Sequence, residues 1–72
     1  MNKEEILKQL GRNIKAERVR KGFSQEDFAE ILHVHPSYIG KVEQGRQNMS
    51  IGKILEFATA LNIHINDLLK FN

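Results

Sequence analysis

The stretch GFSQEDFAEILHVHPSYIGKVEQG, residues 22–45, contains the start signals of two short helices and a turn between them. Ser24 is a preferred helix N-cap, and Asp27 follows three residues later, where its carboxylate can reach back to the cap amide. Pro36 suits the first position of the second helix, because a proline there has no amide hydrogen to leave unpaired. The stretch therefore predicts a helix-turn-helix over about residues 24–44.

Apolar residues at helical spacing predict three more helices outside this unit. The first runs from about Lys3 to Lys21, and Gly22 supplies the left-handed residue that closes it. Ser50 starts a fourth helix, and a short fifth helix is expected from about Ile65 to Phe71. No segment alternates polar and apolar residues for long enough to form a strand. We therefore expect an all-α fold of five helices in one domain over residues 1–72.

The composition of the 72 residues restricts the class of protein. There is no cysteine, so neither a disulfide nor a thiolate metal site can supplement a small core. The first ten residues mix charged with apolar side chains, unlike a secretory leader, and no apolar stretch approaches the roughly 20 residues of a membrane span. A cytoplasmic protein without a membrane partner is expected.

Charge is segregated along the chain although the formal net charge is only +2. Residues 1–22 carry seven Lys and Arg against three Glu, whereas residues 23–34 carry three acids and no base. Residues 35–53 hold three bases against one Glu. This pattern can place a basic face on one side of a small domain, which favours a nucleic-acid partner. Ordinary solvated helix faces are the alternative explanation.

The exact residues of the predicted helix-turn-helix also resemble a known family. GFSQEDFAEIL at 22–32 and PSYIGKVEQG at 36–45 resemble the phage-repressor-like (Cro/Xre-type) helix-turn-helix family. The resemblance covers roughly residues 10–70 and continues through three further motifs, NMSI at 48–51, ATAL at 58–61 and INDL at 65–68. It implies a compact lambda-repressor-like domain that binds DNA. Stand-alone controller proteins of restriction–modification systems are similar members, as are compact phage and plasmid repressors.

The resemblance also implies which residues contact DNA. Ser37 and Lys41 match outward positions that read base edges from the recognition helix, which is expected from Pro36 to Gln44. Pro36 stands where many relatives carry a base-reading side chain; its ring can contact a thymine methyl, and the alternative is that this position reads no base. Part of the base readout is therefore expected to shift to His35.

A second set of positions is expected to contact the phosphate backbone, which fixes the register without reading sequence. Gln25 matches a family glutamine that binds a phosphate and supports the first turn of the recognition helix; a helix N-terminus suits this task. The full set is Gln25, Tyr38, Arg46, Gln47, Asn48 and Lys53, with Arg12 and Lys15 as further candidates. For the charged members the alternative is an ordinary solvated side chain.

Two further implications of the resemblance concern structure. Arg18 and Glu43 match a pair that joins the first helix to the third in relatives, so an ion pair that orients the third helix is expected. His33 stands at a corner position that is often Gly in relatives, because the backbone there can be left-handed. Histidine tolerates that conformation better than a branched residue does.

The function expected from the sequence is that of a sequence-specific transcriptional regulator. One recognition helix reads few base pairs, so a homodimer on two half-sites is expected. The apolar residues expected at the dimer interface are Leu55, Ile63, Ile65, Leu69 and Phe71, although they could simply cover a small core. The alternative function is a protein-binding helix-turn-helix module, such as an antitoxin.

Other chemistry has little support in the sequence. His33 and His35 lie two residues apart across a turn, without the i, i+4 spacing of helical metal ligands, and His64 is remote in sequence. No motif pairs a nucleophile with a base, and no glycine loop could hold a phosphate. We expect no metal, no cofactor, no small-molecule ligand and no catalysis.

Overall fold

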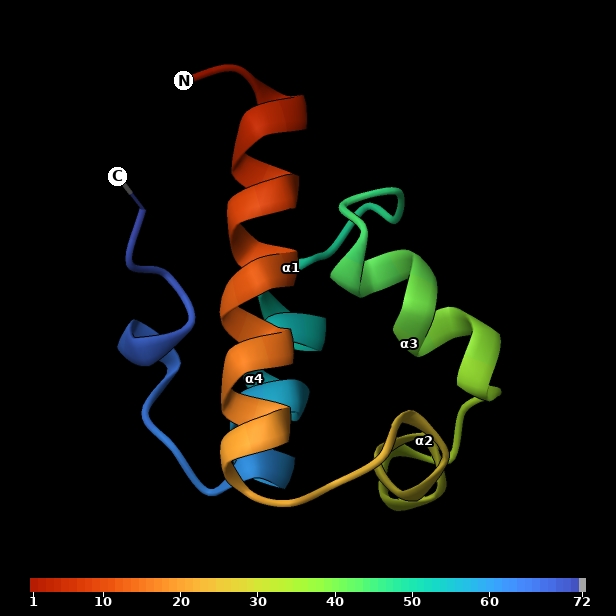
Figure 1. Cartoon of the computed structure of the whole chain (residues 1–72). Coiled ribbons are helices and arrows are strands. Elements are labelled where there is room, and N and C mark those ends of the chain that lie inside the picture. Colours follow the sequence, from red (N-terminus) through yellow and green to blue (C-terminus); the bar gives the residue numbers. More distant parts are fainter. Residues whose placement is uncertain (72) are drawn as a thin grey trace.

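The computed structural model describes residues 1–71, and over this range the chain forms helices and no strand (Figure 1). The elements are α1 (Lys3–Arg20), α2 (Gln25–Leu32), α3 (Pro36–Glu43), α4 (Ile51–Leu61) and the 3₁₀ turn η1 (Ile65–Asp67). In Figure 1, α2 and α3 lie on one side of α1, and the C-terminal segment lies on the other side. The all-α prediction is confirmed, and within residues 1–71 no helix is both long and apolar enough to cross a membrane.

The expected fifth helix, from about Ile65 to Phe71, is wrong. Only the single turn η1 forms, through backbone bonds such as the one from the Asp67 amide to the His64 carbonyl. The backbone bonds of this turn end with the Leu69 amide, and beyond it the side-chain amide of Asn13 on α1 donates to the carbonyls of Leu68 and Lys70, at 3.0 and 2.9 Å. The segment after η1 is thereby bound to α1 and runs along it (Figure 1).

Local sequence signals set the ends of α2. Ser24 Oγ accepts from the Asp27 amide at 2.9 Å, and an Asp27 carboxylate oxygen accepts from the Ser24 amide at 3.3 Å, which completes a capping box. At the other end His33 is left-handed, with φ 59° and ψ 43°. The Val34 amide then donates to the Ala29 carbonyl, which is the six-to-one bond of a Schellman motif. The chain turns within this corner and enters α3.

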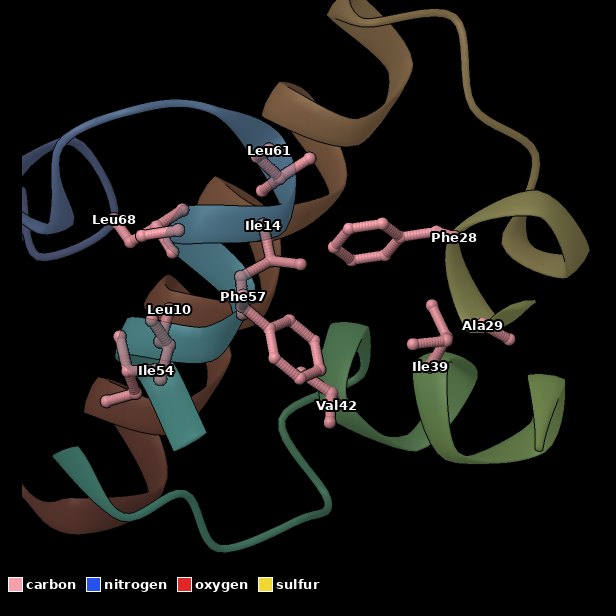
Figure 2. Close-up of a cluster of buried hydrophobic side chains, with 11 residues drawn as sticks. Leu10, Ile14, Phe28, Ala29, Ile39, Val42, Ile54, Phe57, Leu61 and Leu68 are labelled. Atoms are coloured by element: carbon pink, nitrogen blue, oxygen red, sulfur yellow. The ribbon is translucent and has the colours of Figure 1, made fainter. Parts of the chain in front are cut away.

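One apolar cluster contains side chains from all four helices and from Leu68, the residue that follows η1 (Figure 2). Phe28 of α2 and Phe57 of α4 are fully buried and meet edge to face, with ring centroids 5.4 Å apart. The buried members of the cluster are Leu10, Ile14, Phe28, Ala29, Ile39, Val42, Ile54, Phe57, Ala58, Leu61 and Leu68. Because α3 contributes Ile39 and Val42 to this cluster, one of its faces is fixed inward.

Glycine allows α1 to approach the C-terminal end of α3 unusually closely. A Cβ added at Gly11 of α1 would lie 2.5 Å from the carbonyl oxygens of both Val42 and Glu43. Gly45 is left-handed, with φ 73°. A Cβ added at Gly45 would lie 2.7 Å from the Lys8 Cα atom of α1. The two helices therefore pack backbone against backbone at this point.

Candidate nucleic-acid interface

The C-terminal end of α3 is held by a buried ion pair. Arg18 Nε donates to Glu43 Oε2 at 2.6 Å and Nη2 donates to Oε1 at 3.3 Å, so α1 and α3, the two helices expected to be paired, are joined by two parallel bonds. Arg18 Nη1 also donates to the Phe23 carbonyl at 2.6 Å. The side chains are only 9% and 4% exposed, so water screens the pair weakly. The arginine also balances a carboxylate at a helix C-terminus, where the helix dipole disfavours negative charge.

Gln25, expected to bind a phosphate, completes this network. Its Nε2 donates to Glu43 Oε1 at 3.1 Å, and its side chain lies beside Gly40 in the middle of α3. The expected support of the first turn of α3 is therefore corrected, because the contact lies on the last turn. The amide has a second N–H, and the half-buried residue stands at the first position of α2, beside the helix's free backbone amides.

The N-terminal end of α3 is capped by His35. Its ring Nδ1 accepts from the Ser37 amide at 3.1 Å and also lies 2.9 Å from Ser37 Oγ. Both side chains are exposed, and Pro36 between them is half-buried at the first helical position. Two of the four residues expected to contact bases, His35 and Ser37, are therefore bonded to each other.

Lys41 lies one helical turn beyond Ser37 and is exposed on the same outward face of α3. Within residues 1–71 no ion pair involves its ammonium group. Gln44, the C-cap of α3, is also exposed and accepts a bond from Arg46 Nη1 at 3.1 Å. The outward face of α3 thus carries a hydroxyl, an ammonium and an amide, all open to solvent.

The loop after α3 carries the other expected phosphate-binding residues. Arg46 and Asn48 are exposed and Gln47 is half-buried. The Tyr38 hydroxyl donates to Met49 Sδ, directly after Asn48, at 3.6 Å, and its ring packs on Phe57 with centroids 6.3 Å apart. Its packing role is visible, whereas its hydroxyl is already engaged.

The remaining basic candidates belong to α1 and α4. Lys53 pairs with Glu56 on α4 at 3.6 Å, and Arg12 and Lys15 are exposed on α1.

The apolar residues expected at a dimer interface separate into two groups. Ile63, Ile65, Leu69 and Phe71 are half-buried and pack against the core, so most of their surface is already covered. Only Leu55, 52% exposed on α4, projects freely. It lines a groove of about 460 Å³ between the end of α2 and α4, beside the 43% exposed Ile31. Ile51, 66% exposed, stands one turn before Leu55.

Sequence reasoning missed Gly11 and Asn13, although both position the site. Gly11 admits the end of α3 against α1, and Asn13 holds the C-terminal segment on α1. Neither residue carries a local signal, because each acts on backbone that is distant in sequence. His35 was expected at the site as a base contact and also as the N-cap of α3, because a residue before proline favours the extended conformation that a cap requires; the cap is confirmed, whereas the bond of its ring to Ser37 was not expected.

Comparison with known proteins identifies the architecture just described. A helix-turn-helix family model, HTH_3, matches residues 14–68, which include all of α2, α3 and α4. The chain belongs to the HTH_3 helix-turn-helix family. This family is of the Cro/Xre type, as the resemblance implied, and this HTH_3 protein is a DNA-binding transcription regulator.

Curated relatives of this HTH_3 protein include a control protein. This chain is 35% identical over 65 residues to control protein C.SmaI of Serratia marcescens, and the match covers 90% of this chain and 77% of C.SmaI. This chain is also 40% identical over 58 residues to the uncharacterized HTH-type transcriptional regulator YazB of Bacillus subtilis, covering 81% of this chain and 84% of that one.

A solved structure of a similar protein is the crystal structure of the restriction-modification controller protein C.AhdI from Aeromonas hydrophila. It superposes with a TM-score of 0.80 at 40% identity, covering 86% of this chain and 94% of that one. The fold is therefore shared over nearly the whole length of both proteins.

Proposed function

We propose that this HTH_3 regulator binds a two-fold symmetric operator as a homodimer, with α3 in the major groove. The observation that carries the proposal is the division of α3 into two faces. Ile39, Val42 and Glu43 are buried against the rest of the protein, whereas Ser37 and Lys41 are exposed on the opposite side. A helix held in this way can enter a groove without rearranging, since the groups that fix it are not those that would meet DNA.

The charges around α3 fit a polyanionic partner. Lys41 and Arg46 flank the C-terminal part of the helix, and the amide of Gln25 lies beside it at the free N-terminus of α2. Helix N-termini and basic side chains are the groups that usually bind phosphate oxygens. In the proposed complex Gln25, Arg46, Gln47 and Asn48 hold the phosphate backbone while Ser37 and Lys41 face base edges.

Lys41→Ala is expected to weaken binding to a selected operator about tenfold, because a direct base contact contributes about 1–3 kcal/mol. Binding to random duplex should weaken much less. The measurement is a fluorescence titration against both duplexes at two salt concentrations, where the wild type should lose affinity steeply with salt. Lys70→Ala is the matched control, since Lys70 is exposed on the C-terminal segment on the other side of α1. Equal losses on both duplexes would exclude base reading by Lys41, and no binding at low salt would instead favour a protein-binding module.

The dimer surface that we propose centres on Leu55, with Ile51 on the same helix and Ile31 across the groove. These three side chains are more than 40% exposed, and an exposed apolar patch on a small domain is typical of an interaction site. A self-complementary contact between two copies would cover all three. A dimer of this kind would read two half-sites about 34 Å apart, or a multiple of that.

Leu55→Glu is expected to raise the dimer dissociation constant at least tenfold, because it places a charge in a desolvated apolar contact. Sedimentation equilibrium over a range of concentrations measures the change. Val19→Glu is the control, as Val19 is similarly exposed, at 58%, on α1. If the two variants dimerise equally well, the surface around Leu55 is not the interface.

A further inference from the structure

His35 contacts both the backbone amide and the side-chain hydroxyl of Ser37, so the contact is more than a helix cap. His35 Nδ1 is 3.1 Å from the Ser37 backbone nitrogen and 2.9 Å from Ser37 Oγ. A backbone N–H can only donate a hydrogen bond, so Nδ1 must accept it and cannot itself carry a hydrogen. The geometry therefore fixes the tautomer of the neutral ring, with its single hydrogen on Nε2.

This tautomer also fixes the direction of the second contact. Because Nδ1 has no hydrogen to give, the 2.9 Å contact with Ser37 Oγ is a hydrogen bond only if the hydroxyl donates. A serine hydroxyl has one hydrogen and two lone pairs. With its hydrogen directed to His35, the exposed Ser37 can offer only acceptor lone pairs to an incoming molecule.

We propose that His35 positions the Ser37 hydroxyl as an acceptor, so that α3 presents an acceptor at Ser37 beside a donor at His35 Nε2. This inference rests on the proposed function and adds the chemistry of the base that α3 selects. In the major groove the amino groups of adenine N6 and cytosine N4 donate, whereas guanine O6, thymine O4 and purine N7 accept. Ser37 then selects a base with an amino group, and His35 Nε2 donates to an adjacent purine N7, a keto oxygen or a phosphate.

A matched control is present in the same chain. His64 caps η1 in the same manner, with its Nδ1 accepting from the Asn66 amide at 3.2 Å. The residue at the position equivalent to Ser37 is an asparagine, so no hydroxyl is oriented there. The segment lies on the other side of α1 from α3 (Figure 1). Loss of this cap tests what capping alone contributes to DNA binding.

The test is selection of binding sites from randomised duplexes by the wild type and by four variants. The wild type should prefer amino over keto bases about tenfold at one position of each half-site. His35→Ala and Ser37→Ala should both lose this preference and keep the rest of the motif. His35→Asn should restore it, because the asparagine carbonyl can accept from both the amide and the hydroxyl of Ser37. His64→Ala should select the wild-type motif.

A measurement without DNA tests the same geometry. Nitrogen-15 NMR of the neutral imidazole rings should show the Nε2–H tautomer at His35. The inference is overturned by an Nδ1–H tautomer, or by a His35→Ala variant that keeps the wild-type preference at the Ser37 position. Failure of the proposed function is a different result, in which the wild type selects no motif, and it overturns the inference as well.

Discussion

Gly11→Ala should lower the free energy of unfolding by about 3 kcal/mol, which is at the upper end of the cost of overpacking. The added methyl group would lie 2.5 Å from the carbonyl oxygens of Val42 and Glu43. These are backbone atoms at the end of α3, so relief requires α3 to move away from α1. Chemical denaturation monitored by circular dichroism measures the change. A weaker affinity for DNA should accompany it, because the displaced α3 would leave the position set by the ion pair.

Gly40→Ala provides the control for this prediction. Gly40 is also in a helix interior, but a Cβ there meets only the Gln25 side chain, at 4.0 Å. Alanine is favoured over glycine in helices by about 0.5–1 kcal/mol, so this variant should be neutral or slightly more stable. If Gly11→Ala were equally well tolerated, the close approach of α1 to α3 would not be essential to the fold.

Removing one partner of the buried ion pair has an expected cost of about 3–5 kcal/mol, since the other charge stays buried without its partner. For a chain of this length that is a large part of a total stability of roughly 4–11 kcal/mol. Arg18→Ala would leave the Glu43 carboxylate with only the Gln25 amide. Glu43→Ala would leave the Arg18 guanidinium with only the Phe23 carbonyl.

The double variant separates this coupling from loss of packing. With both side chains replaced by alanine, no buried charge remains unpaired, so the destabilisation should be smaller than the sum of the single variants by at least about 1 kcal/mol. Urea titration of the four proteins in the cycle gives this coupling energy. Additive effects would mean that Arg18 and Glu43 act independently. The pair would then have no role in orienting α3.

Features of the fold that depend on neighbouring residues were predictable from the sequence. The capping box of Ser24 and Asp27 and the helix start at Pro36 each act within a few residues, whereas the left-handed corner at His33 was implied by the family resemblance. Apolar periodicity predicted the buried faces, because α-helices repeat every 3.6 residues. Arg18 and Glu43 lie 25 residues apart, and their pairing came from the family resemblance and not from either residue alone.

Features that depend on distant backbone were not predictable in this way. Asn13 binds the carbonyls of Leu68 and Lys70, which lie 55 and 57 residues further along the chain, and no local pattern indicates this contact. Gly11 looks like an unfavourable residue within a long helix until the end of α3 is placed against it. At the candidate site, the bond between His35 and Ser37 depends on the orientation of a ring, which a sequence pattern does not describe.

The division of α3 into a buried and an exposed face has a consequence for how such a protein can diversify. Ile39, Val42 and Glu43 fix the helix, and Ser37 and Lys41 are free of that task. Under the proposed function, new DNA targets are therefore accessible through surface substitutions that leave folding stability nearly unchanged. A lineage of such proteins can drift from one operator to another while each intermediate remains folded.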